Sequence, residues 1–131
     1  MSPLERPFRP ADLTETPVRS FDLHALATQL TQEPQYQAEG KAGLTLIRDA
    51  QVILLLEALR KGSALREHRA PASALVTLLS GRATFVSEAG AQRTALTPGT
   101  AVAFAAGLDH TLIADEDSAC LIVIGGRAER S

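Results

Sequence analysis

From Gly43 onward, this chain is a succession of short runs of Val, Ile, Leu and Thr that end at glycine, proline or acidic residues. Runs of about four to eight such residues between turn signals are typical of β-strands. The pair Ser80-Gly81 favours a tight hairpin, and Pro98-Gly99 supplies the proline and glycine of a type II turn. Strands joined by such short turns must pair antiparallel with their neighbours.

We therefore predict an all-β fold, either a sandwich or a barrel, for this part of the chain. The nine predicted strands are Leu44 to Arg48, Gln51 to Arg60, Ala64 to His68, Ala74 to Leu79, Arg82 to Ser87, Arg93 to Leu96, Thr100 to Phe104, His110 to Ala114 and Ala119 to Ile124.

The region before the strands has a different pattern. Four prolines interrupt residues 1–19, so we predict an extended arm there. Apolar residues within Phe21 to Gln32 recur at the spacing of one helix face, with Ser20 or Asp22 as N-cap, which predicts one short helix. Because 131 residues suit a single core, we expect one domain over residues 20–126 and a tail over residues 127–131.

Two of the predicted strands are apolar on both faces. Val52 to Leu56 and Leu121 to Ile124 carry no polar residue, so the outer face of their sheet needs a cover. The single predicted helix or a second copy of the chain would provide it. We therefore predict a homodimer.

Charge and cysteine content exclude several classes of partner and compartment. Thirteen basic and fifteen acidic residues give a net charge of −2 with no basic stripe, which argues against nucleic-acid binding. No apolar window approaches the roughly 20 residues of a membrane span. Cys120, the only cysteine, cannot form an intramolecular disulfide. We predict a cytoplasmic protein in which Cys120 is a buried small hydrophobe, the alternative being a catalytic thiol.

Two spaced patterns within the β region have the frame of known motifs. Gly62 is followed after five residues by His68, and Ala70, Ala74 and Gly81 then stand at intervals of one, three and six residues. In the cupin motif with this spacing, the positions of Ala70 and Ala74 carry a histidine and a glutamate. The frame resembles the first cupin motif, with two of its metal ligands replaced by alanine.

The second pattern resembles the second cupin motif. Gly99 is followed after five residues by Ala105, at a position that is proline in the motif, and then by Gly107 and His110 at the motif spacing. Ala114 stands where the motif has asparagine. Of the chain's three histidines, two thus fall on ligand positions.

The resemblance implies a cupin-type double-stranded β-helix, a jelly-roll-like barrel with a central pocket that in this family typically holds a metal through three histidines and a glutamate. Here His68 and His110 are the remaining motif donors, whereas a metal site needs about three or four. Arg66 would share the face of His68 on a regular strand and would favour an anionic ligand, or it would lie in solvent. Glu57, or Glu67 at a bulge, are the carboxylates considered as substitutes.

Three roles for His68 and His110 stay open. In the first, they are polar residues that are hydrogen-bonded inside the barrel. In the second, they belong to a small-molecule pocket, and in the third, they are part of a residual metal site. We expect ligand-binding residues His68, His110 and Arg66, with no metal; if a metal binds, His68 and His110 are its ligands. The predicted function is a non-metallic small-molecule binding or sensing module with an unknown ligand and no cofactor. The alternative is a cupin enzyme, an oxygenase, isomerase or decarboxylase, that uses one divalent transition metal. The acidic run from Asp115 to Asp117 is interpreted as a solvated turn.

Overall fold

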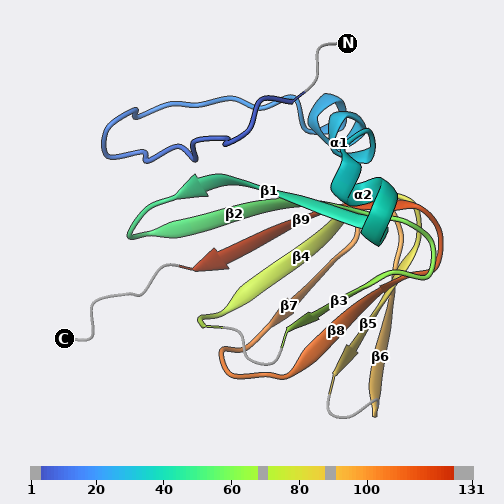
Figure 1. The fold of residues 1–131 in the computed structure, drawn as a ribbon. Helices are drawn as coiled ribbons and strands as arrows, with labels where there is room; N and C mark the ends of the chain where they lie inside the picture. The colour runs from blue at the N-terminus through green and yellow to red at the C-terminus, as the bar shows by residue number, and fades with distance from the viewer. Residues whose placement is uncertain (1–3, 68–70, 88–90, 126–131) are drawn as a thin grey trace.

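Two antiparallel sheets face each other in the computed structural model of this chain, and two short helices lie on the outer side of one of them (Figure 1). The structure describes residues 4–67, 71–87 and 91–125. Its helices are α1 (Leu23–Thr31) and α2 (Pro34–Glu39), and its strands are β1 (Lys41–Arg48), β2 (Val52–Leu59), β3 (Ala64–Glu67), β4 (Ala74–Ser80), β5 (Ala83–Ser87), β6 (Gln92–Leu96), β7 (Ala101–Phe104), β8 (His110–Ala114) and β9 (Ser118–Gly125).

The strand order places sequence-distant strands side by side. The larger sheet has the order β1-β2-β9-β4-β7, and the smaller has the order β3-β8-β5-β6. Over the described residues the two sheets remain separate, so the predicted barrel is a sandwich of two open sheets. The all-β prediction and its nine strands are confirmed, with ends that shift by a few residues. The predicted antiparallel hairpins at Ser80-Gly81 and Pro98-Gly99 are wrong, because each of these turns joins strands of different sheets. The predicted third strand extends to His68, which lies outside the described residues.

The prediction of one helix is wrong, because a second helix follows the first. Asp22 caps α1 as expected, since its Oδ1 accepts a hydrogen bond from the backbone N–H of Ala25 at 3.1 Å. α2 begins at Pro34 and ends at Gly40, which adopts a left-handed conformation. Proline at the first helical position loses no hydrogen bond, so Pro34 starts a helix at a place where the sequence pattern indicated an end.

The molecule has two apolar layers. One lies between the helices and the larger sheet, where Leu30 of α1 packs with Leu44, Leu46 and Leu56. The other lies between the two sheets and includes Phe85. Strand β1 alternates buried and half-buried residues, as expected for a strand whose two faces have different surroundings. The helices therefore cover the part of the outer face formed by β1 and β2.

A tight turn connects β4 to β5 at Gly81. This glycine has a φ of 89°, and a Cβ there would lie 2.3 Å from the carbonyl oxygen of Asp117. Ser118 joins the same junction, because its hydroxyl donates to the carbonyl oxygens of Arg82 and Glu116 at 3.0 and 2.8 Å. The β4–β5 and β8–β9 turns are thus packed backbone against backbone, which only glycine permits.

The N-terminal arm lies along the free edge of β1 (Figure 1). Ala11 forms a parallel bridge with Ile47: its N–H donates to the carbonyl of Leu46 at 2.8 Å, and its carbonyl accepts from Arg48 N–H at 2.9 Å. The arm therefore satisfies backbone groups that an edge strand would expose. Among the described residues, no helix is long and apolar enough to cross a bilayer.

Cys120 is buried, as predicted, and we expect its thiol to be inert in the native protein. Burial, with a smaller contribution from the charge of Glu57, raises the pKa of this thiol to about 12. Because the thiolate is the reactive form, maleimide labelling at pH 8 should require unfolding, with the denatured chain as the positive control. Rapid labelling of the native chain would contradict the prediction of an inert thiol.

The raised pKa of Cys120 also makes stability depend on pH. Because the folded pKa lies above the unfolded value, the free energy of unfolding falls as pH rises from about 9 toward 12, and Cys120→Ala should remove this effect.

The homodimer stays a prediction, and the structure indicates where to test it. Leu75 and Val123 are cross-strand partners on the outer face of the larger sheet, half-buried and outside the layer that packs against the helices. If a second copy covers this face, Leu75→Lys should convert a dimer into a monomer by light scattering, because a buried charge is costly. Ala95→Lys, at an exposed position on β6 of the smaller sheet, is the control. A monomeric wild-type protein at micromolar concentration would contradict the prediction.

Candidate functional site

A small cavity lies between the two sheets at the end away from the helices. Its volume is about 60 Å³, room for roughly four water molecules. Among the residues that the structure describes, eleven line it, of which ten are apolar and the other is His110. The lining consists of Leu55, Leu65, Pro71, Ala74, Val76, Phe85, Phe104, His110, Leu112, Ile122 and Ile124. The cavity thus combines an apolar wall with one imidazole.

Strand alternation explains which residues face the cavity. Ala74 and Val76 are two residues apart on β4, and their register partners on β9 are Ile124 and Ile122. Residues two apart on a strand share one face, and direct cross-strand partners share it as well. The positions between them, Leu75 and Val123, face outward, so the larger sheet presents an aliphatic wall to the cavity.

His110 is held between two phenylalanine rings. Its ring centroid lies 5.3 Å from that of Phe85, with 18° between the planes, and 4.3 Å from that of Phe104, with 49° between the planes. The two phenylalanine rings are themselves 5.0 Å apart. Because Phe85 comes from β5 and Phe104 from β7, the cluster joins the two sheets. These contacts fix the plane of the imidazole.

The hydrogen bond of His110 selects the role of each ring nitrogen. Nδ1 lies 3.0 Å from the carbonyl oxygen of Leu108. A carbonyl only accepts, so Nδ1 carries the proton and donates. Nε2 has no hydrogen-bond partner among the residues that the structure describes. In the neutral ring, Nε2 is therefore the atom that can accept a hydrogen bond from a ligand or water.

Two alanines at motif positions pack as apolar residues. Ala74 is 8% exposed and lines the cavity, and Ala114 is 1% exposed within the core between the sheets. His68 and Ala70 lie outside the described residues. Within residues 4–67, 71–87 and 91–125, no three His, Cys, Asp or Glu side chains are placed to share a metal ion. Ala74 supplies no donor at the position that carries glutamate in the motif, and Ala114 stands at the asparagine position, which is not one of the motif's metal ligands.

Arg66 is not among the described residues that line the cavity, so its role in ligand binding stays a prediction. It is exposed, whereas its neighbour Leu65 lines the cavity and pairs with Leu112. Adjacent strand residues point to opposite faces, so the burial of Leu65 turns Arg66 outward. β3 ends at Glu67, whose Cα is in register with that of His110. Glu57, considered as a carboxylate ligand, lines a separate cleft at the edge of β1.

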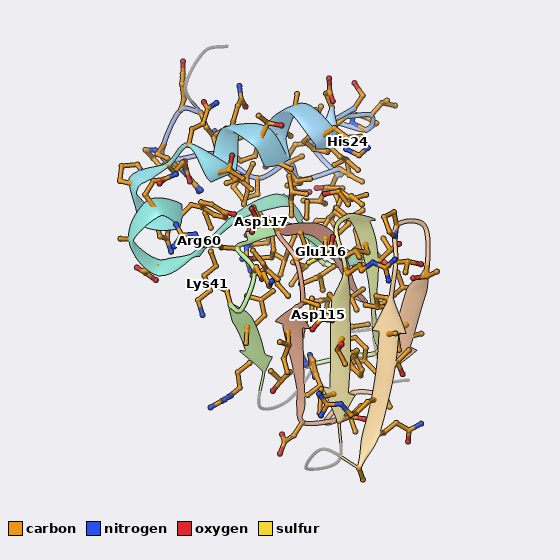
Figure 2. All side chains as sticks on the ribbon, turned by 90° about the vertical axis from the view of Figure 1, so that its right-hand side faces the viewer. His24, Lys41, Arg60, Asp115, Glu116 and Asp117 are labelled. Atoms are coloured by element: carbon orange, nitrogen blue, oxygen red, sulfur yellow. The ribbon has the colours of Figure 1, made fainter. Side chains whose placement is uncertain are left out.

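The other charged residues singled out in the sequence lie at the opposite end of the sandwich. Figure 2 shows His24 on α1 and the residues Asp115, Glu116 and Asp117 at the turn below the helices. The three acidic residues are exposed, as predicted, and each has a structural contact. Asp115 accepts from the Thr84 hydroxyl, Asp117 accepts from the Lys61 N–H, and Glu116 pairs with Arg82. They belong to the turn and not to the cavity.

No pattern in the sequence indicated Phe85 and Phe104 as site residues. They are two of only four phenylalanines in the chain, but they are nineteen positions apart, on strands of different sheets. An apolar residue in a strand is normally interpreted as core. Their role beside His110 follows only from the way the sheets face each other.

Comparisons with known proteins identify the fold. No family model and no curated protein matches the sequence. Among solved structures, a cupin superfamily protein from Desulfitobacterium hafniense is 19% identical, with a TM-score of 0.64 over 76% of this chain and 86% of that one. A protein of unknown function from Streptococcus pyogenes is 22% identical, with a TM-score of 0.68 over 98% of both chains. The dimethylsulfoniopropionate (DMSP) lyase DddQ from Ruegeria pomeroyi is 20% identical, with a TM-score of 0.62 over 76% of this chain and 54% of that one.

The fold is therefore that of the cupins, as the two motifs predicted. At these identities the likeness concerns the fold, and folds of this kind carry both enzymes and proteins without known activity. The function has to be argued from the cavity itself.

We expect the two motif histidines to contribute little to stability. Replacing His68 and His110 together with glutamine should change the free energy of unfolding by about 1 to 2 kcal/mol, because His110 lies at a cavity and an amide can also donate to Leu108. Phe85→Ala is the control and should cost about 3 to 5 kcal/mol, since this ring is 3% exposed. Denaturant unfolding measures both. If the double variant is as unstable as Phe85→Ala, the two histidines stabilise the fold and the prediction is wrong.

Proposed function

We propose that the protein binds a small, largely apolar organic molecule between its sheets without a metal ion, and that it acts as a binding or sensing module. The observation that carries this proposal is the lining of the cavity, ten apolar residues and one imidazole. Small-molecule sites combine an apolar wall with a few placed polar groups. His110 supplies such a group in a fixed orientation.

The orientation of His110 supports a ligand with one hydrogen-bond donor. Nδ1 is engaged by Leu108, which leaves Nε2 as an acceptor in the neutral ring. The aliphatic wall and the edges of Phe85 and Phe104 suit a ring or a branched alkyl group. Phenol has both features, so it is a suitable probe of this chemistry.

Phenol should therefore bind more tightly than toluene, which has a similar shape and no donor. We expect about a tenfold difference in Kd by isothermal titration, the equivalent of one net hydrogen bond. His110→Gln should reduce this difference. Ala74→Leu should abolish binding of both probes, because its side chain fills the cavity, while the exposed Ala103→Leu on neighbouring β7 is the size-matched control.

Equal affinity for phenol and toluene would remove His110 from the site. Binding that survives Ala74→Leu would place the ligand elsewhere. The metal-dependent alternative is tested on the same material by titrating zinc into chelator-treated protein. We expect no stoichiometric zinc binding at micromolar concentration, because alanine occupies two positions that carry ligands in the motif.

A further inference from the structure

A second concave site lies at the edge of the sandwich, where β1, β3 and the N-terminal arm meet. It has a volume of about 430 Å³, several times that of the cavity between the sheets. Its lining is polar and charged on one side, with Arg6, Lys41 and Glu57, and apolar on the other, where Phe8 and Leu65 contribute. Leu65 lines both sites and therefore stands between them. We call this second site the edge cleft.

The carboxylate of Glu57 is placed in the edge cleft by a glycine. Gly43 and Glu57 are register partners on β1 and β2. A Cβ on Gly43 would lie 2.2 Å from Oε2 of Glu57, so the carboxylate occupies the space that any other side chain would fill. Glycine weakens a strand interior and often marks a close approach of another group. The half-buried Glu57 thus lies against the bare backbone of β1.

Two basic residues, Lys41 and Arg6, line the edge cleft together with this carboxylate. Lys41 reaches from β1 to the other sheet, where its Nζ donates to the Ala64 carbonyl at 3.2 Å, and Figure 2 shows it beside β3. An ammonium group has three donors, and this contact uses one of them. Lys41 therefore keeps donors for a ligand at the mouth of the cleft.

Arg6 comes from the arm and is fixed in place. It forms a two-point ion pair with Glu33 at 2.9 and 2.8 Å, and its Nη2 also donates to the carbonyl of Gly43 at 2.8 Å. The pKa of Arg6 is raised, chiefly by the hydrogen bond to Glu33 and to a smaller extent by the charges of Glu33 and Glu57, against the opposing effect of burial. The field of Glu57 therefore reaches the arm.

Arg6 is paired with Glu33, which is not among the residues that line the cleft. Beyond that ion pair, the described lining carries one basic and one acidic side chain, Lys41 and Glu57. An anion would meet the Glu57 carboxylate and a cation would meet the Lys41 ammonium group, so neither matches both. A ligand that carries both charges does. We propose that the edge cleft binds a small zwitterion of the α-amino acid class, with its ammonium group at Glu57, its carboxylate at Lys41 and its side chain against Phe8 and Leu65.

Leucine and two analogues that each lack one charge test this site. We expect L-leucine to bind at least tenfold more tightly than 4-methylpentanoate, which has no ammonium group, and than 3-methylbutylamine, which has no carboxylate. Isothermal titration at low salt measures all three. If leucine does not bind, or if either analogue binds equally well, the zwitterion site is wrong.

Gly43→Ala is the sharpest variant, because it displaces the Glu57 carboxylate without changing any charge. The backbone at Gly43 has no positive φ, so alanine is sterically allowed there apart from this contact. Leucine affinity should fall at least tenfold in Gly43→Ala and in Glu57→Gln, with no further loss in the double variant, since both remove one interaction. Wild-type affinity in a folded Gly43→Ala would overturn the proposal. If Gly43→Ala fails to fold, the leucine affinity of Glu57→Gln tests the proposal, and wild-type affinity in that variant would overturn it.

Two more variants separate this site from others. Lys41→Met should weaken leucine and 4-methylpentanoate but not 3-methylbutylamine, whereas Lys61→Met, at an exposed turn, should change nothing. Ala74→Leu, which fills the cavity between the sheets, should leave leucine binding intact. Loss of leucine binding in Ala74→Leu would assign the ligand to that cavity and overturn the edge cleft, independently of the phenol result.

Discussion

The pairing of β9 with both β2 and β4 is the interaction on which the rest of the structure depends. β9 is the last strand in the sequence but lies in the middle of the larger sheet. Its Ala119 belongs to the layer under the helices, and the next residue, Cys120, belongs to the layer between the sheets. Further along, Ile122 and Ile124 line the cavity. Because one strand contributes to both apolar layers and to the site, its register fixes all three at once.

The cavity between the sheets follows from the same alternation, combined with small residues. Ala74 faces the interior at a point where a larger side chain would fill the space, beside its register partner Phe104 on the same sheet, while Phe85 and His110 come from the smaller sheet. In the resembling motif, position 74 carries an acidic metal ligand. With alanine there, the described lining of the cavity is apolar apart from His110. The frame of the motif is thus compatible with quite different chemistry, as is common among proteins that share a fold.

The N-terminal arm and the glycine of β1 create a second environment at the sheet edge. The arm pairs with β1 through Ala11 and brings Arg6 over the carbonyl of Gly43. An edge strand with open backbone groups is a liability, and the arm covers it. The same arrangement gathers charged groups of both signs around Glu57, so protection of the edge and formation of the edge cleft have one structural cause.

The sequence by itself determined the number and approximate ends of the strands, the burial of Cys120 and the cupin frame, because turn residues, apolar runs and motif spacing are local signals. It limited the cap of α1 to Ser20 or Asp22, and the structure decided for Asp22. It did not determine which residues of β3 face the interior, because four residues with one large apolar side chain are too few to show an alternating pattern. The pairing of Leu65 with Leu112 decided that Arg66 faces outward. Nor did the sequence indicate that Phe85 and Phe104 meet at His110, or that Gly43 lies under Glu57. Those relations join residues distant in the chain, and they exist only once strand order and register bring the two sheets together.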